Sequence, residues 1–176
     1  MMRAKNELAS CMQSGLPLAD AIALANAHLS EGNDALTFVT VRAGMLDLQT
    51  GTLTFVNAGH NEPLLLRKGR WEWLRLSDGP LMGFSDLAAY QSRTLTLEAG
   101  DMLLLFTDGV TEAMNTQRKL YGEKRLKALV DAHVESAPRE LDDAVRTDLA
   151  TWAAGTEQSD DITMLTVRMH RTAGRE

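Results

Sequence analysis

Two short acidic segments offer the clearest chemistry in this sequence of 176 residues. Asp108 and Gly109 come just after the apolar run 102–106, and Asp160 and Asp161 directly precede another apolar run. A carboxylate at the end of a strand is held by a rigid element and can face outward toward a cation. Adjacent acids repel each other, so Asp160 and Asp161 need either a nearby cation or full exposure to solvent.

Carboxylate oxygens suit hard divalent cations, so the two segments together predict a site for Mg²⁺ or Mn²⁺. The chain has one cysteine, Cys11, and neither a cysteine pair nor a histidine cluster with the spacing of a zinc site. Each acidic segment also has a plain structural reading. Asp-Gly is a common turn pair, and adjacent acids can simply be solvated.

A third candidate is the segment 57–63, which reads Asn-Ala-Gly-His-Asn-Glu-Pro. A single histidine in a glycine-containing turn is more often structural than catalytic. We therefore expect Gly59 and His60 to form a turn between strands at 53–57 and 63–67. In that turn a ring nitrogen of His60 would bond to the backbone.

Composition narrows the class of protein. The chain is 44% apolar and 24% charged, as in an ordinary globular domain. A net charge of −6 without any basic stripe argues against a nucleic-acid partner. No nucleotide-binding glycine loop, Gly-x-Ser-x-Gly elbow or Cys-x₅-Arg cradle occurs. The single cysteine, the polar start and the lack of an apolar run of about 20 residues favour a reducing cytoplasm and no membrane partner.

Helices and strands must position these residues. Four segments have the pattern of a helix: 1–13, 17–31, 122–134 and 138–154. Pro17 and Gly32 mark the ends of the second helix, and Ser136 is the expected N-cap of the last. Strand patterns occupy 38–48, 53–56, 64–66, 71–74, 90–97, 102–106 and 162–169. Glycine-containing turns at 49–51 and 68–70 predict two hairpins.

Taken in order, these motifs resemble one family, the PPM metal-dependent serine/threonine protein phosphatases. The resemblance points in particular to the bacterial branch of stage II sporulation protein E and the stress-response phosphatases that act on anti-anti-sigma factors. Each motif alone is weak, but the ordered set is specific and extends over about residues 1–169. The matching segments are 38–40, 57–63, 79–83, 104–113, 121–122 and 159–163.

The resemblance implies an α+β fold, in which an antiparallel β-sandwich is flanked by helices in α-β-β-α layers. It implies two Mn²⁺ or Mg²⁺ ions in a complete family site, where a metal-held water attacks phosphoserine or phosphothreonine. By resemblance, Asp108 and Asp160 are ligands of one metal. Asp161 and Gly109 have supporting roles, and Gly59 and His60 form the structural turn described above.

The resemblance also predicts the domain limits: a partial phosphatase domain at 1–170, truncated at its N-terminus, and a loose tail at 171–176. The family's Gly-Asp-x-x-Asp and Asp-x-Ser-Gly-x-Gly motifs do not occur, and the second carries the Asp that bridges the metals. The leading hypothesis is a phosphatase acting on a phosphorylated, anti-anti-sigma-like regulatory protein. The alternative is a catalytically incomplete phosphatase that serves as a binding module. The N-terminal helices are the candidate surface for a homodimer.

Overall fold

The computed structural model describes residues 2–35, 37–75 and 79–170. The chain forms two compact units, and each is described by itself. Unit 1 comprises Met1–His60 and Leu76–Leu97, and unit 2 comprises Asn61–Arg75 and Glu98–Glu176.

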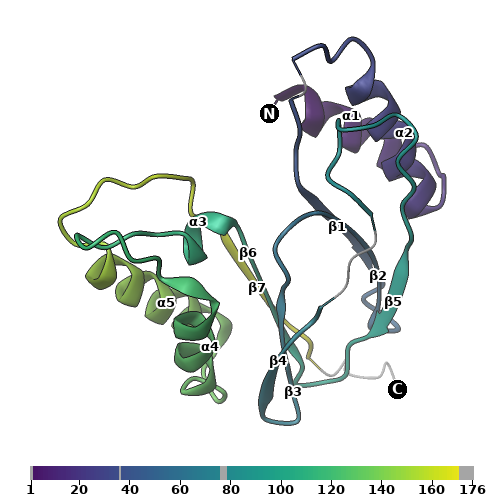
Figure 1. Ribbon diagram of the computed structural model, residues 1–176. Helices are drawn as coiled ribbons and strands as arrows, with labels where there is room; N and C mark the ends of the chain where they lie inside the picture. The colour runs from purple at the N-terminus through teal and green to yellow at the C-terminus, as the bar shows by residue number, and fades with distance from the viewer. Residues whose placement is uncertain (1, 36, 76–78, 171–176) are drawn as a thin grey trace, which may run out of the picture. The chain divides into compact units, whose positions relative to one another are not determined.

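Two helices begin unit 1 and lie side by side (Figure 1). α1 spans Met2–Met12 and α2 spans Leu18–Ser30, close to the predicted segments. Pro17 precedes α2 in an extended conformation, and Gly32 follows its end with a φ of +66°, as expected for a helix stop. One stripe of α2 faces the core of unit 1, with almost no exposure at Ala21, Ile22 and Ala25.

The sheet of unit 1 has the order β1-β2-β5, and both pairs of neighbours are antiparallel. Its strands are β1 (Val41–Leu46), β2 (Thr52–Ala58) and β5 (Arg93–Thr96). β1 and β2 form the first predicted hairpin, closed by a hydrogen bond from the Asp47 amide to the Thr52 carbonyl. β5 is shorter than the predicted strand at 90–97, and Tyr90 is instead buried in the core cluster of unit 1.

A buried asparagine joins α2 to the loop at 79–88. The Asn26 side chain accepts a hydrogen bond from the Gly83 amide at 2.8 Å and donates one to the Ser85 carbonyl at 2.7 Å. A buried amide is costly unless it is paired, so these bonds hold the loop on the helix. Gly83 has a φ of +86°, and a Cβ there would lie 2.7 Å from a backbone oxygen. The motif at 79–83 is therefore part of the scaffold of unit 1.

The sheet of unit 2 has the order β4-β3-β6-β7, again antiparallel throughout. Its strands are β3 (Leu64–Arg67), β4 (Arg70–Trp73), β6 (Met102–Phe106) and β7 (Met164–Arg168). β3 and β4 form the second predicted hairpin, with positive φ at Lys68 and Gly69 in its two-residue turn. β6 lies between β3 and β7, and four of its five side chains are buried, as its continuous apolar run predicts.

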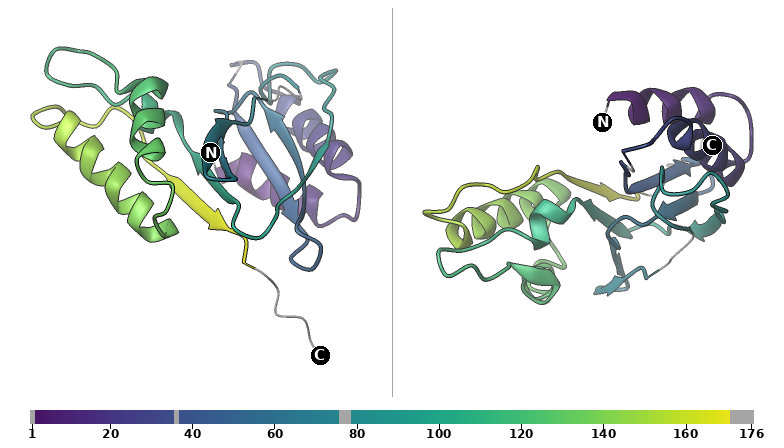
Figure 2. Two further views of the ribbon diagram at one scale, coloured as in Figure 1. Left: turned by 90° about the horizontal axis from the view of Figure 1, so that it is seen from below. Right: turned by 45° about the horizontal axis from the view of Figure 1, so that its top comes forward.

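Unit 2 contains the helices α3 (Asp108–Thr111), α4 (Gly122–Asp131) and α5 (Pro138–Trp152). α5 runs alongside β7 (Figure 2). The prediction of Ser136 as N-cap is wrong by one residue: the cap is Ala137, whose amide donates to the Glu140 carboxylate at 2.8 Å. The reason is Pro138, which occupies the first helical position and favours extended backbone in the residue before it. The short α3 was not predicted, because its Asp-Gly start resembles a turn.

A charged network ties α4 to α5. Asp148 accepts hydrogen bonds from the Tyr121 hydroxyl at 2.6 Å and from Nε and Nη2 of Arg125 at 2.8 and 2.7 Å. The Arg125 guanidinium also lies 4.6 Å from the centroid of the Trp152 ring. The hydrogen bonds from Arg125 outweigh the opposite effect of burial and, with the bond from Tyr121, lower the pKa of Asp148.

The fold is α+β with antiparallel sheets, in agreement with the class predicted from the sequence. The predicted tail at 171–176 lies outside the described residues. Within the described ranges, no helix is both long enough and apolar enough to span a bilayer.

Candidate metal centre

The pairing of β6 with β7 brings the two acidic segments to one end of the unit 2 sheet. The strands are antiparallel and in register at Phe106 and Met164, so residues that follow β6 lie beside residues that precede β7. Asp108 comes two residues after Phe106, and Asp160 comes four residues before Met164. Both acids therefore occupy the same end of the sheet, although they are far apart in the sequence.

Thr107 holds the two segments together. Its amide donates to the Thr163 carbonyl at 3.0 Å, which extends the strand pairing by one step. Its hydroxyl donates to the Asp161 carbonyl at 2.7 Å and accepts from the Thr163 amide at 3.0 Å. This role of Thr107 was not predicted from the sequence. The available signal was a hydroxyl, able to donate and accept at once, between an apolar strand and an acid.

Gly109 permits the closest backbone approach at this site. A Cβ on Gly109 would lie 2.6 Å from the carbonyl oxygen of Asp161 and 3.3 Å from that of Asp160. Its φ lies outside the left-handed region, so the need for glycine here is a need for space. The backbones of Gly109 and Asp161 are thus in close contact, and the supporting roles of these two residues at a metal stay a prediction.

The two predicted ligands each have one carboxylate oxygen bound to a neighbouring amide. Asp108 Oδ1 accepts from the Gly109 amide at 3.0 Å, and Asp160 Oδ1 accepts from the Asp161 amide at 2.7 Å. The second oxygen of each carboxylate accepts no hydrogen bond from any residue that the structure describes. Asp108 is half-buried and Asp160 is exposed, so both can reach a cation that keeps water ligands.

These side chains fit a hard cation in type, since both offer carboxylate oxygen. Among the described residues, neither belongs to a group of three potential ligands whose atoms lie within 4.8 Å of one another. That Asp108 and Asp160 together bind an ion, with water completing its coordination, stays a prediction.

A pocket of about 470 Å³ opens beside this end of the sheet. Its lining includes Gly109 and Asp160 and, from α5, Asp142 and Arg146. Arg146 could not be predicted as a site residue, because a lone arginine on a helix carries no motif. It supplies a positive charge beside the acidic segments.

The turn at 57–60 is closed by Asn57. The side chain of Asn57 accepts from the His60 amide at 2.9 Å and donates to the His60 carbonyl at 3.1 Å. The His60 ring contacts the Thr40 hydroxyl at 3.0 Å through Nδ1, and the expected bond from the ring to the backbone stays a prediction. Gly59 has a φ of +73°, and a Cβ there would lie 3.1 Å from the Leu81 amide nitrogen.

Comparison with known proteins identifies the family of the chain. Residues 1–170 match the family model of stage II sporulation protein E (SpoIIE). The chain is 32% identical over 149 residues to Protein IcfG of Synechocystis sp. (strain ATCC 27184 / PCC 6803 / Kazusa), which covers 84% of this chain and 23% of IcfG. It is 25% identical over 142 residues to phosphoserine phosphatase RsbU of Bacillus subtilis (strain 168), which covers 80% of this chain and 42% of RsbU. The chain thus spans less than half the length of either relative.

Solved structures share the fold. The SiaA-PP2C domain of Pseudomonas aeruginosa superposes with a TM-score of 0.80 and 21% identity over 95% of this chain and 68% of that one. The RsbU and RsbW domains of Rv1364c from Mycobacterium tuberculosis superpose with a TM-score of 0.76 and 21% sequence identity, over 97% of this chain and 47% of that one. The manganese-presoaked phosphatase domain of SpoIIE from Bacillus subtilis superposes with a TM-score of 0.67 and 19% sequence identity, over 98% of this chain and 76% of that one. With the match over residues 1–170, this fold places the chain in the stage II sporulation protein E family of PP2C-type phosphatase domains.

Proposed function

We propose that this chain is part of a protein phosphatase that hydrolyses phosphoserine or phosphothreonine on a regulatory protein. The observation that carries the proposal is the β6–β7 pairing, which brings Asp108 and Asp160 to one end of a sheet in a member of this family. The cofactor we propose is Mn²⁺ or Mg²⁺, two ions in a complete site. When bound, such ions would act as Lewis acids on the phosphoryl oxygens and lower the pKa of a water molecule.

The roles of the chain's own residues follow from their chemistry. Asp108 and Asp160 would each offer a carboxylate oxygen to one ion, from two elements that are held in register. Thr107 would keep the second element in place through its bond to the Asp161 carbonyl. Gly109 would let the two backbones approach, and the exposed carboxylate of Asp161 would add negative charge beside the ion.

The proposed substrate class comes from the relatives. RsbU is named a phosphoserine phosphatase, and one solved relative combines an RsbU domain with an RsbW domain. We infer a phosphorylated, anti-anti-sigma-like regulatory protein as the substrate and the cytoplasm as the compartment. The pocket beside Gly109 and Asp160 is the candidate binding site for the substrate residues that flank the phosphorylated side chain. There Arg146 would attract acidic substrate residues. A homodimer through α1 and α2 stays a prediction.

A second function is favoured by one observation on the sequence. The Asp-x-Ser-Gly-x-Gly motif, which in the family carries the bridging acid, does not occur in these 176 residues. A two-metal site needs a carboxylate shared by both ions to hold them about 3.5–4 Å apart. A chain that lacks this carboxylate would retain the surface that meets the partner but lose turnover. It would then act as a binding module for the same regulatory protein.

The ligand assignment is tested by Mn²⁺ titration of residues 1–176, followed by electron paramagnetic resonance of the free ion. We expect Asp108→Asn and Asp160→Asn each to lower the Mn²⁺ affinity by at least about tenfold, because each removes one of two charged ligands. The matched control is Asp34→Asn. Asp34 is exposed, lies in unit 1 and has no hydrogen-bond or ion-pair partner among the described residues.

The same substitutions separate the two functions. In a chain joined to the missing family motifs, both Asn variants should abolish turnover of a phosphoserine peptide, while Asp34→Asn should not. If Asp108→Asn and Asp160→Asn both bind Mn²⁺ as tightly as the parent, the metal assignment is refuted. Turnover absent from the joined parent chain would favour the binding module.

A further inference from the structure

One face of α1 makes a series of contacts with the end of α2. Arg3, Glu7 and Cys11 are spaced four residues apart, so they lie in one row along α1. The Arg3 guanidinium donates to the His28 carbonyl at 2.6 Å, and Glu7 Oε2 lies 3.0 Å from His28 Nδ1. Cys11 completes the row one turn further along.

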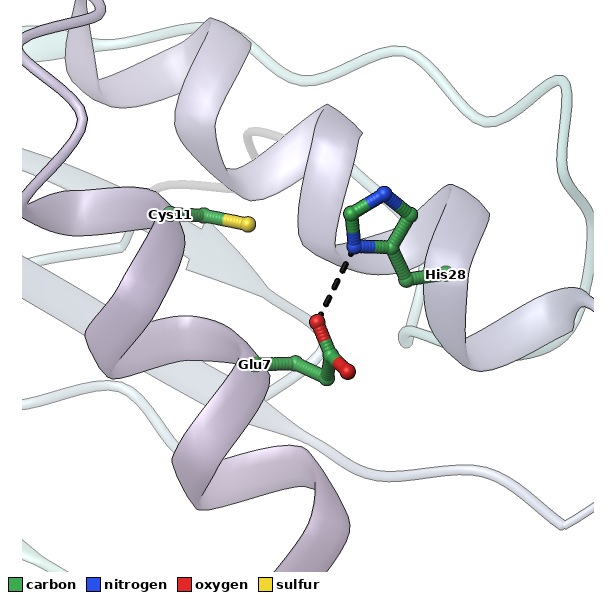
Figure 3. Close-up of side chains that lie close together, drawn as sticks. All are labelled: Glu7, Cys11 and His28. Carbon is green, nitrogen blue, oxygen red and sulfur yellow. Dashed lines mark hydrogen bonds and ion pairs between the residues drawn. The ribbon is translucent and has the colours of Figure 1, made fainter.

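Three of these side chains bring metal-binding atoms together. The Cys11 sulfur, a Glu7 carboxylate oxygen and a His28 ring nitrogen all lie within 4.8 Å of one another. Figure 3 shows the imidazole of His28 and the carboxylate of Glu7 facing each other, with the Cys11 sulfur directed toward the same space between the helices. It is the one group of three such ligands found in the residues that the structure describes.

The burial of the three ligands is graded. Cys11 is 5% exposed, whereas the side chains of Glu7 and His28 are 33% and 46% exposed. The sulfur therefore forms the floor of the group, and the carboxylate and imidazole form its rim. An exposed ion pair explains Glu7 and His28 but contributes little to stability. It also gives no role to the Cys11 thiol, which accepts and donates no hydrogen bond among the described residues.

The sulfur, nitrogen and oxygen atoms of this group determine which kind of metal ion it can bind. A thiolate with an imidazole and one carboxylate suits zinc and other thiophilic divalent ions, in contrast to the all-oxygen set at Asp108 and Asp160. Ligands at zinc distances of about 2.0–2.3 Å in a tetrahedron lie roughly 3.3–3.7 Å apart. Glu7 Oε2 and His28 Nδ1, at 3.0 Å, are already closer than two zinc ligands would be. The other ligand atoms are at most 4.8 Å apart, so they need to approach one another by only about 1 Å. Rotation of exposed side chains can supply that closure.

We propose that Glu7, Cys11 and His28 form a second, thiophilic metal site, which binds Zn²⁺ with three protein ligands and a solvent molecule at the exposed rim. The site links α1 to α2, two helices that are otherwise joined by packing and by the Arg3 contact. The spacing of sequence motifs could not reveal it. Glu7 and Cys11 share one helix, but the third ligand comes from a different helix, 17 residues after Cys11.

Cobalt provides a selective probe, because Cys11 is the only cysteine of the chain. Any absorption from a thiolate–Co²⁺ bond therefore reports this site and not Asp108 or Asp160. Chelator-treated protein 1–176 is titrated with Co²⁺ in the near ultraviolet, and Zn²⁺ is then added in competition. We expect a saturable band at one Co²⁺ per chain, displaced by one Zn²⁺. Saturating Zn²⁺, at about 100 times its Kd, should raise the thermal midpoint of unfolding of the 176-residue chain by roughly 5–10 °C.

The decisive variants change the two rim ligands and leave the sulfur in place. Glu7→Gln and His28→Ala should each weaken Co²⁺ binding by at least about 10–100-fold. Both positions are partly exposed, so far-ultraviolet circular dichroism should stay at the parent value. The matched control is His133→Ala, which removes an imidazole from unit 2 whose Nδ1 contacts the Leu129 carbonyl. It should leave the titration unchanged.

Two results would overturn the proposal. One is the absence of a thiolate band at any Co²⁺ concentration that leaves the protein soluble. The other is a band whose midpoint is the same in the parent, Glu7→Gln and His28→Ala, since that would mean that Cys11 binds the ion without these two partners. A double variant, Asp108→Asn with Asp160→Asn, should keep the band and so separates this site from the proposed catalytic one.

Discussion

Replacing Gly109 with alanine should loosen the candidate metal centre, even though alanine is the better helix former. Gly109 lies in α3 with a backbone conformation that alanine can adopt. On helix propensity alone, the substitution should raise the free energy of unfolding by about 0.5–1 kcal/mol. The sign of the measured change therefore tests whether the close backbone contact outweighs propensity.

The contact is tight enough to reverse that sign. The new Cβ would lie 2.6 Å from the Asp161 carbonyl oxygen, whereas ordinary contacts begin at 3.4 Å, so the backbones must separate by about 0.8 Å. The same carbonyl accepts the Thr107 hydroxyl at 2.7 Å. A shift of that size along this bond would stretch it to about 3.5 Å, where little hydrogen-bond energy remains. Overpacking costs about 1–3 kcal/mol and a lost hydrogen bond about 1 kcal/mol, so we expect a net destabilisation of about 1–3 kcal/mol.

The displaced backbone belongs to the segment that carries Asp160. A functional side chain must stay within about 0.5 Å of its productive position, and a misplacement near 1 Å can cost about 100-fold. We therefore expect Gly109→Ala to lower the Mn²⁺ affinity of residues 1–176 by about 10–100-fold.

Urea unfolding and Mn²⁺ titration measure the two effects separately, and Gly69→Ala is the matched control. Gly69 has a φ of +73° in the β3–β4 turn, with no atom within 4 Å of a new Cβ. Alanine there should cost about 1–2 kcal/mol through backbone strain alone and leave Mn²⁺ binding intact. A Gly109→Ala variant as stable as the parent, or one whose Mn²⁺ affinity matches that of Gly69→Ala, would refute the proposed effect of the close contact.

Three further outcomes are expected. Asp148→Asn should lower the free energy of unfolding at pH 7 by about 1–2 kcal/mol, with solvent screening of the partly exposed Arg125 included. Folding lowers the pKa of Asp148, so its contribution to the free energy of unfolding is present above the unfolded pKa near 4 and disappears as the pH falls through the folded pKa. Urea unfolding between pH 7 and pH 3 should therefore show the free energies of unfolding of the variant and the parent converge toward low pH. His60→Ala should lower the free energy of unfolding in urea by about 0.5–1.5 kcal/mol and leave Mn²⁺ binding unchanged, because it removes a contact with Thr40 but keeps the Asn57 bonds to the backbone. Lost activity with unchanged stability would contradict a structural role. Residues 1–176 alone should hydrolyse a phosphoserine peptide far more slowly than the same chain joined to the missing family motifs, and equal rates would mean that Glu62, Glu112, Asp161 or a partner supplies the bridging ligand.

The sequence predicted those features of the fold that depend on local pattern. The apolar run 102–106 is a buried central strand, and the glycine turns at 49–51 and 68–70 both lie in hairpins. α3 could not be predicted in this way, because one turn of helix after a strand has too few residues to show a period. Its Asp-Gly start favours a turn on local grounds.

The candidate site depended on pairing between distant segments. Nothing near Asp108 indicates that Asp160 will lie at the same end of a sheet; the family resemblance supplied that expectation. The hydroxyl of Thr107 and the space at Gly109 emerge only when β7 is placed beside β6. That Asp108 and Asp160 bind a metal stays a prediction. The Asn26 contacts with the loop at 79–88 were likewise invisible, since a polar residue on a helix gives no sign of its partner.

The alternation of the two units along the chain has a consequence for biosynthesis. Unit 2 receives its β3–β4 hairpin from residues 61–75, before the second part of unit 1 has been translated. A two-stranded hairpin is at best marginally stable until β6 joins it. The roughly 27 residues between Arg75 and Met102 take about 1–5 s to synthesise. During that interval the hairpin lacks β6, and the side chains of Leu64, Leu66 and Trp71 also lack the α4 and α5 residues with which they are buried in the finished protein. Codon changes that slow the ribosome between residues 76 and 101 would prolong this exposure and reduce the soluble yield, while the folded product stays the same.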